Sequence, residues 1–266
     1  MEKLGPLLAL FAHPDDEGII GGTLAFSAAE GHPVTLICLT RGQAGKSSYP
    51  AITTPEALAH LRKKELQEAC RILGVSDLRH WDYMDGRLDR ADANEVVGRI
   101  VEVMREVRPE VVITFGPEGI YGHPDHLAAH RLVREAYYAA GDPRRYPQHL
   151  DAGHYAHQVR KLYYVAFPKS FFEGPNPRRR SRTMEINGVT YYFHAIDDEE
   201  ISTVVDVSAF TERKIDAYCA HQSQALPGST RATLSRESMV KNFALEYLIR
   251  AEPPWDGKNR ESNIFQ

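Results

Sequence analysis

The stretch LLALFAHPDDEGIIGGTLAF, residues 7–26, decides the fold because it joins an apolar run to a helical pattern through a polar junction. The apolar run is typical of a buried strand, and the helical pattern begins near Glu17. Between them stand His13, Asp15 and Asp16. Helix N-termini favour carboxylates because their unpaired backbone N–H groups carry partial positive charge. One capping acid would satisfy that preference, so a histidine with three acids predicts a functional site at the end of the strand.

Strand and helix patterns alternate through the first half of the chain. Short β-branched runs predict strands at residues 7–12, 34–40, 78–83 and 111–115. Helical patterns lie between and after them, at about residues 17–30, 55–73, 93–107 and 124–140. This alternation is typical of a parallel sheet with helices on both faces. The predicted fold class is therefore α/β, a Rossmann-like parallel sheet in which the first four strands take the common doubly wound order 3-2-1-4.

The alternation breaks after Gly141, so we expect a single domain, residues 1–266, with a Rossmann-like core (1–141) and a smaller mixed C-terminal lobe (142–266). In this lobe the patterns predict strands at residues 162–167 and 203–207, a β-hairpin turning at Asn187–Gly188, and helices at about residues 210–221 and 236–250. From residue 253 onward we expect a loosely held extension. The basic cluster PRRRSR, residues 177–182, is interpreted as a solvated loop, with contact to an anionic substrate or partner as the alternative.

Composition excludes several classes of function. The chain has 266 residues, of which 42% are hydrophobic and 26% charged, and its formal net charge is −4. This charge gives no footprint for nucleic acid, and no apolar run approaches the ~18 residues of a membrane span. Charges follow the first apolar run at once, unlike a signal peptide. Cys38, Cys70 and Cys219 lie far apart, which indicates reduced thiols and a cytoplasmic protein.

A second polar cluster follows the fourth predicted strand. The stretch GPEGIYGHPDHLAAH, residues 116–130, contains Tyr121, His123, Asp125 and His126. In the doubly wound order strands one and four are neighbours whose connections leave in opposite directions, so both clusters are expected at one crevice. A dinucleotide does not fit there, because no G-x-G-x-x-G turn follows the first strand and the acids would repel a pyrophosphate.

These residue types suit a divalent metal. Imidazole and carboxylate are zinc ligands, and a catalytic zinc takes three protein ligands plus water. Two histidines and one aspartate meet that requirement and leave a second aspartate as a base. His126 and His130 are four residues apart on one helix face, so spacing alone does not choose between them; we interpret His130 as a packing residue. Taken singly, Asp15 could be only a helix cap and His123 only a loop histidine.

At these residues the sequence resembles the LmbE-like (PIG-L) family of metal-dependent de-N-acetylases. Its signatures [AP]HPDDE and HPDH occur at residues 12–17 and 123–126. Similar supporting stretches are TRGQAG (40–45), LRKKELQEACRILG (61–74), YMDGRL (83–88) and AHQSQ (220–224). Members of this family deacetylate N-acetylglucosaminyl conjugates, and one branch cleaves the amide of thiol conjugates. The resemblance covers residues 7–224, although residues 141–197 match no signature, so the aglycone is not identified.

The resemblance implies a set of roles for the polar residues. It makes His13, Asp16 and His126 the ligands of Zn²⁺, with Fe²⁺ as the alternative metal. It makes Asp15 the general base. It makes His123 the general acid or oxyanion stabiliser, oriented by Asp125.

Three further residues match substrate-contacting positions of the family. Tyr121 matches a tyrosine that polarises the carbonyl, Arg62 matches a sugar-binding arginine, and Asp85 matches an acceptor for a sugar hydroxyl. Without the resemblance, Arg62 could equally pair with Glu65 on the same helix face.

The predicted function is a zinc-dependent hydrolase that removes an N-acetyl or N-acyl group from an N-acetylglucosaminyl-type conjugate with metal-activated water. Two alternatives are an amidase that cleaves a larger thiol–sugar conjugate and a non-catalytic metal-dependent sugar-binding protein. The presence of both Asp15 and His123 argues against the binding protein, because binding needs neither a base nor an acid. The expected partner is a small-molecule aminosugar conjugate, without nucleic acid or membrane, and the sequence leaves a homo-oligomer open.

Overall fold

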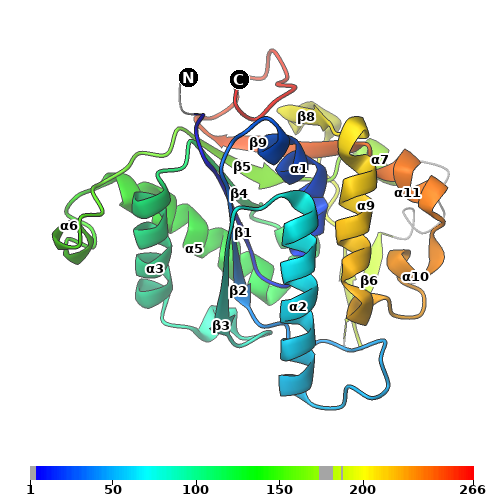
Figure 1. The fold of residues 1–266 in the computed structure, drawn as a ribbon. Coiled ribbons are helices and arrows are strands. Elements are labelled where there is room, and N and C mark those ends of the chain that lie inside the picture. Colours follow the sequence, from blue (N-terminus) through cyan, green and yellow to red (C-terminus); the bar gives the residue numbers. More distant parts are fainter. Residues whose placement is uncertain (1–3, 174–181, 187) are drawn as a thin grey trace.

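The computed structural model describes residues 4–173, 182–186 and 188–266 (Figure 1). A seven-stranded sheet crosses the molecule in the order β3-β2-β1-β4-β5-β9-β8. Its strands are β1 (Leu7–Phe11), β2 (Val34–Thr40), β3 (Asp77–Tyr83), β4 (Val111–Phe115), β5 (Lys161–Val165), β8 (Thr203–Asp206) and β9 (Leu245–Glu252). The strands from β3 to β5 are all parallel, which confirms the expected order 3-2-1-4 and the α/β class. As the centre of this parallel sheet, β1 is buried on both faces.

Helices cover both faces of the sheet (Figure 1). One face carries α1 (Gly21–Ala29), α2 (Pro55–Leu73) and α9 (Thr211–Ala220); the other carries α3 (Ala93–Val107) and α5 (Pro124–Gly141). Local signals set these bounds: Thr54 caps α2 by accepting a hydrogen bond from the backbone N–H of Ala57, and Gly74 ends the helix with a left-handed φ of 81°. In the part of the chain that the structure describes, no helix has the length and apolar character to cross a membrane.

The C-terminal part contributes three strands to the same sheet. β9 runs antiparallel to both β5 and β8. The expected helix over residues 236–250 is therefore partly wrong: α11 covers Arg236–Phe243, and the chain then becomes strand β9. Glu246 and Leu248 are buried at alternate positions, which is the two-residue period of a strand. The segment is too short for this period to be distinguished in the sequence from the helical pattern that precedes it.

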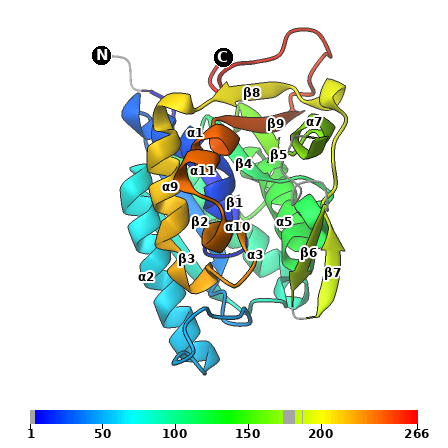
Figure 2. The same cartoon turned by 90° about the vertical axis from the view of Figure 1, so that its right-hand side faces the viewer.

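A β-hairpin lies beside the sheet. β6 (Thr183–Ile186) pairs antiparallel with β7 (Val189–Tyr192), which confirms the expected hairpin. Asn187 of its turn lies outside the described residues, as does the basic cluster except for Arg182. Figure 2 shows this hairpin on the same side of the molecule as the short helix α10 (Thr230–Thr233) and α11.

The end of the C-terminal segment packs on the sheet, so the expected loose extension from residue 253 is wrong for residues 261–266, whereas residues 253–260 are largely exposed. Ile264 is 1% exposed. Glu261 accepts hydrogen bonds from the Nζ of Lys161 at 2.7 Å and from the hydroxyl of Tyr163 at 2.6 Å. Lys161 begins β5 and is buried, so it needs a buried counter-charge, and residues 261–266 supply it.

A buried ion pair joins β9 to helices α1 and α9. The Nζ of Lys214 donates to the Glu246 carboxylate at 2.6 Å, and the backbone N–H groups of Gly22 and Thr23 donate to the same carboxylate at 2.8 Å each. Lys214 is 5% exposed and Glu246 is 3% exposed. Both charges are therefore shielded from water.

We expect Glu246→Ala to lower the free energy of unfolding by about 3–5 kcal/mol, because it leaves the Lys214 ammonium buried without a partner. Urea denaturation followed by circular dichroism measures this change. The control is Glu237→Ala, which breaks an exposed pair with Lys241 and should change the free energy by less than about 1 kcal/mol. Equal destabilisation in both variants would contradict the prediction that breaking the buried pair lowers the free energy of unfolding more than breaking an exposed pair.

Candidate metal centre and active site

The first polar cluster lies where β1 ends. After Phe11 the chain turns through His13 and Asp15 into a short 3-10 helix, Asp16–Ile20. Asp15 has φ 117°, a left-handed conformation that costs strain in a residue with a side chain. The backbone N–H of His13 donates to the Asp16 carboxylate at 2.7 Å. This turn therefore places the Asp16 carboxylate beside the His13 ring.

The second cluster lies where β4 ends, around the start of α5. His123 caps α5: its Nδ1 accepts the backbone N–H of Asp125 at 3.2 Å. One turn on, His126 stacks on Phe115 with ring centroids 4.0 Å apart. The Nδ1 of His126 lies 3.1 Å from the Gly119 carbonyl, to which it donates, so its Nε2 lone pair faces the first cluster. Because β1 and β4 are adjacent, the structure brings the two clusters together.

Three buried side chains place donor atoms at nearly equal distances from one another. The Nε2 of His126 lies 3.3 Å from the Nδ1 of His13 and 3.4 Å from the Oδ1 of Asp16, and the other oxygen of Asp16, Oδ2, lies 3.3 Å from the His13 Nδ1. Ligands at about 2.0–2.2 Å from a tetrahedral zinc are about 3.4 Å apart. The spacing therefore fits a divalent metal. Two other groupings also have all their donor atoms within 4.8 Å of one another: His13 with His123 and His126, and His13 with Asp85 and Asp125.

Two carboxylates hold the opposite edge of the His13 ring. Its Nε2 lies 3.1 Å from Asp85 and 3.1 Å from Asp125. A proton on Nε2 leaves the Nδ1 lone pair for a metal, the usual arrangement of a metal-bound histidine. Burial disfavours the Asp85 charge, but the hydrogen bond with His13 lowers the pKa of this carboxyl to about 2. Both acids are thus in place to fix the tautomer of His13.

This placement differs from the expectation for Asp125 and adds a contact for Asp85. Asp125 was expected to orient His123, but its carboxylate contacts His13 and accepts the backbone N–H groups of Gly86 at 2.6 Å and Leu88 at 2.9 Å. Asp125 contacts the His123 ring through its backbone N–H. The Asp85 carboxylate contacts His13, accepts the backbone N–H of Ala44 at 3.0 Å and lines the cavity, so its expected contact with a sugar hydroxyl stays a prediction.

Two arginines hold Asp15, whose side chain is 23% exposed. One carboxylate oxygen lies 3.2 Å from the Nη2 of Arg62, and the other lies 3.2 Å from the Nη1 of Arg231. The alternative pair between Arg62 and Glu65 does not form; Glu65 instead accepts from the backbone N–H of Ser223 at 2.7 Å and from its hydroxyl at 2.6 Å. The expected base therefore sits ionically paired at the surface of the site.

Arg231 is the site residue that sequence reasoning missed. It lies on α10, where its guanidinium stacks 4.0 Å from the ring centroid of Tyr218 and its Nε donates to the Tyr218 carbonyl at 2.8 Å. No signature covers residues 225–235, and the contact with Asp15 spans 216 positions. Only the folded chain reveals it.

Glu17, the third acid of the junction, supports the turn. One oxygen accepts the backbone N–H of Asp15 at 2.9 Å, and the other lies 2.5 Å from the Nε2 of His221. Both Glu17 and His221 are buried. Glu17 thus fixes the strained backbone of Asp15 and ties it to the segment AHQSQ.

Tyr121 and His123 complete the centre. The Tyr121 ring lies 5.0 Å from His126 between centroids, and burial raises the pKa of its hydroxyl well above the usual range, so it stays a donor. Burial, with the nearby His13 and His126 rings, lowers the pKa of His123 to about 4. Because Nδ1 of this neutral ring accepts a backbone N–H, its proton is on Nε2. The Nδ1 of His130, by contrast, lies 3.0 Å from the Phe115 carbonyl, which fits the interpretation of His130 as a packing residue.

A cavity of about 1050 Å³ opens over these side chains. Its polar end is lined by His13, Asp15, Arg62, Asp85, Tyr121, His123 and Arg231. Hairpin strand β6 contributes Met184 and Ile186 on another side. His13 therefore places the candidate metal centre at the wall of a cavity large enough for a small-molecule substrate.

A sequence model of the PIG-L family, described as GlcNAc-PI de-N-acetylase, matches residues 8–137. A curated protein of Streptomyces avermitilis, 1D-myo-inositol 2-acetamido-2-deoxy-alpha-D-glucopyranoside deacetylase, is 34% identical across 98% of this chain and 96% of its own length. The chain belongs to the PIG-L family. The resemblance found in the sequence is thereby confirmed.

Solved structures place this PIG-L protein in a fold with more than one activity. The conserved protein TT1542 from Thermus thermophilus is 26% identical, with a TM-score of 0.66 over 95% of this chain and 97% of that one. A 4-carboxy-2-hydroxymuconate hydratase of Pseudomonas putida has a TM-score of 0.67 over 95% of this chain and 98% of its own, at 19% identity, and shows the fold alone. Because the fold also carries a hydratase, the activity has to be argued from the site residues.

Proposed function

We propose that this PIG-L protein is a metal-dependent de-N-acetylase that hydrolyses the acetamide of an N-acetylglucosaminyl conjugate. The observation that carries the proposal is the close approach of His13, Asp16 and His126, whose nitrogen and carboxylate oxygen atoms lie 3.3–3.4 Å apart, with Asp15 lining the same cavity as His13. The Streptomyces avermitilis relative is named as a deacetylase of an inositol-linked aminosugar, which supports this substrate class.

We assign the metal to His13, Asp16 and His126. Two imidazoles and one carboxylate suit Zn²⁺, with Fe²⁺ as the alternative. When bound there, the ion supplies Lewis acidity and lowers the pKa of a coordinated water. Asp85 and Asp125 keep the His13 Nδ1 free to bind it.

The chain's own residues supply the proton transfers and part of the charge stabilisation. Asp15 takes a proton from the attacking water as its oxygen adds to the amide carbon, and returns it to the amine as the C–N bond breaks. The Tyr121 hydroxyl and the Nε2–H of neutral His123 donate to the developing oxyanion. One such donor contributes about 3–4 kcal/mol to stabilising a transition state. Acetate and a free amine are the products.

The rest of the chain supports the substrate side of the proposal. Arg62 and Asp85 line the cavity next to Asp15 and His13, as contacts to sugar hydroxyls require. Residues 1–141 hold all the proposed metal ligands, whereas residues 142–266 add Arg231, and we retain this division into core and lobe. We propose the cytoplasm as the compartment because Cys38, Cys70 and Cys219 are all free thiols.

An acetate-release assay on zinc-loaded protein tests the proposal. We expect acetate from N-acetylglucosaminyl glycosides, and no acetate after the metal is removed with a chelator. Cleavage of a thiol–sugar conjugate at its larger amide, without acetate release from the glycosides, would indicate the alternative amidase. Binding of the glycosides without any product would indicate a sugar-binding protein and overturn the proposal.

A further inference from the structure

A row of aromatic side chains leads away from the metal centre along the cavity. Phe193 lies 5.5 Å from Tyr121, Phe172 lies 5.8 Å from Phe193, and Phe171 lies 5.2 Å from Phe172, all between ring centroids. Tyr247 on β9 follows at 6.5 Å from Phe171. Phe167 contacts three members of the row, Phe193, Phe172 and Phe171. We call Phe167, Phe171, Phe172, Phe193 and Tyr247 the aromatic wall.

The aromatic wall is a lining of the cavity as well as a part of the core. All five side chains line the cavity that contains the metal centre. Phe172 is buried, whereas the other four are half-buried. Half-buried rings that line a cavity give it apolar surface on which an apolar group of a ligand can pack.

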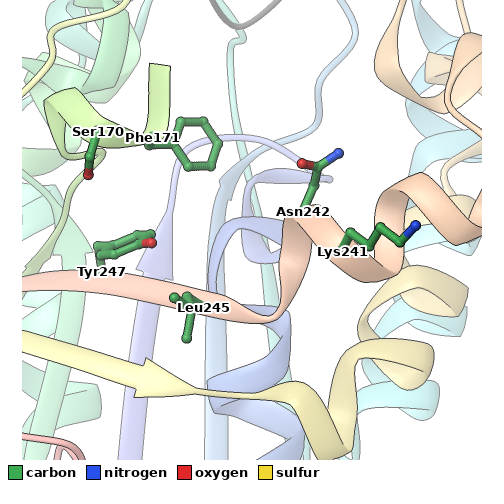
Figure 3. Close-up of a pocket in the computed structure, with 6 residues that line it drawn as sticks. All are labelled: Ser170, Phe171, Lys241, Asn242, Leu245 and Tyr247. Atoms are coloured by element: carbon green, nitrogen blue, oxygen red, sulfur yellow. The ribbon is translucent and has the colours of Figure 1, made fainter. Parts of the chain in front are cut away.

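A small pocket extends the far end of the wall. It has a volume of about 150 Å³, and Figure 3 shows its lining. Phe171 and Tyr247 belong both to this pocket and to the aromatic wall, and Leu245 adds an exposed aliphatic side chain. Ser170, Lys241 and Asn242 add polar groups to this pocket, so the apolar surface that begins at Tyr121 extends as far as Phe171, Tyr247 and Leu245.

The cavity thus has two chemically different parts. Asp15, Arg62, Asp85 and Arg231 surround the polar part, where the hydroxyls of an aminosugar find partners. The four phenyl rings of the wall offer no hydrogen bonds and Tyr247 adds a single hydroxyl, so a polyhydroxylated group such as inositol would lose most of its water without compensation there. The volume of about 1050 Å³ is at the upper limit for small-molecule sites, ~1,000 Å³, which leaves room for a second group beside the sugar.

We propose that the substrate carries an apolar group, an aryl ring or an alkyl chain, which packs on the aromatic wall while the aminosugar occupies the polar part. This inference rests on the proposed function and narrows its substrate class. The apolar group enters either as the aglycone of the glycoside or as the acyl group of the amide; both have the same chemistry toward the wall. The reaction is unchanged, because the wall touches no reacting atom.

Matched substrates test the wall with zinc-loaded protein. We expect phenyl N-acetylglucosaminide to have a KM about tenfold lower than methyl N-acetylglucosaminide, the discrimination that one buried apolar group gives. Phe171→Ala should remove that advantage by raising KM for the phenyl glycoside alone, with kcat nearly unchanged. Phe171→Leu, which keeps an apolar side chain, should retain most of it. The control Tyr155→Ala removes an aromatic ring that is 70% exposed and should change neither KM.

A second pair of substrates separates the two sources of the apolar group. N-benzoylglucosamine and N-acetylglucosamine differ only in the acyl group, and glucosamine release is measured for both. A dependence on Phe171 with the benzoyl amide and not with the phenyl glycoside assigns the wall to the acyl group; the reverse assigns it to the aglycone. Equal KM values within both pairs, or a loss in Phe171→Ala that is the same for all substrates, would overturn the proposal.

Calorimetric binding to metal-free protein distinguishes failure of this inference from failure of the proposed function. Phenyl N-acetylglucosaminide should bind about tenfold more tightly than the methyl glycoside, and Phe171→Ala should abolish the difference. If no substrate is hydrolysed but this difference is present, the proposed hydrolase activity is wrong and the wall stands. If hydrolysis occurs but neither phenyl N-acetylglucosaminide nor N-benzoylglucosamine binds more tightly than its matched partner, the inference about the wall is wrong and the proposed function stands.

Discussion

Asp15→Asn is expected to keep a full complement of metal and to lose about 10²–10⁴-fold in kcat. The amide is nearly isosteric with the carboxylate but cannot take a proton from water. It also has one acceptor oxygen in place of two, so it can hold only one of the two cations, Arg62 and Arg231, that contact Asp15 at 3.2 Å. Steady-state kinetics with elemental analysis of the same sample measures both quantities.

The matched control is Asp82→Asn, which makes the same chemical change at an exposed position of β3. It should leave both kcat and metal content at the wild-type level. A metal-replete Asp15→Asn protein with wild-type kcat would remove Asp15 from the mechanism. A variant that had lost its metal would show instead that the turn between β1 and its 3-10 helix depends on the charge of Asp15.

The order of the first four strands could be predicted from local sequence together with one topological rule. β1, β2 and β4 are apolar runs, β3 is a more polar strand, and helices separate all four; the doubly wound order then places the ends of β1 and β4 side by side. That rule predicts that His13 and His126 lie close together although they are 113 positions apart in the sequence. The ends of the strands are predictable because they follow from the pattern of apolar residues, which depends only on neighbouring positions in the sequence.

Contacts that depend on the folded chain were not predictable. The segment 245–252 is a strand because β5 and β8 provide backbone hydrogen-bond partners on both of its sides. This tertiary pairing overrides the local helical pattern of the segment. Glu261 is held by the buried Lys161, and Arg231 by Asp15 and the Tyr218 ring. Lys161 and Glu261 are 100 positions apart, and Asp15 and Arg231 are 216 positions apart. No motif spacing in the sequence predicts contacts over such separations.

Within the site, too, the partners of the three acids of the junction could not be predicted from the sequence. Asp15, Asp16 and Glu17 are consecutive, yet the turn directs Asp16 to the histidines, Asp15 to two arginines and Glu17 to His221. The motif predicts that a site is present. The backbone of the turn, with Asp15 at φ 117°, decides which carboxylate has which partners.

His126→Ala is expected to have the other large effect, on metal binding. Removing an imidazole leaves only His13 and Asp16 of the three donors. Changing a residue that merely supports a metal ligand weakens metal binding by about 10–100-fold, so loss of a ligand itself should weaken it by more than about 100-fold. Dialysis against a competing chelator, followed by elemental analysis, measures the retained metal, and activity should fall to background.

His130→Ala is the control, because it removes the same ring from the same helix, one turn further on. His130 bonds to the Phe115 carbonyl at 3.0 Å and packs on Tyr164, so its loss should affect stability and leave the metal in place. Metal retained by His126→Ala and lost by His130→Ala would reverse the assignment of the ligand. Metal retained by both would move the site to the group of His13, Asp85 and Asp125, the other buried set of donors that the described residues bring together.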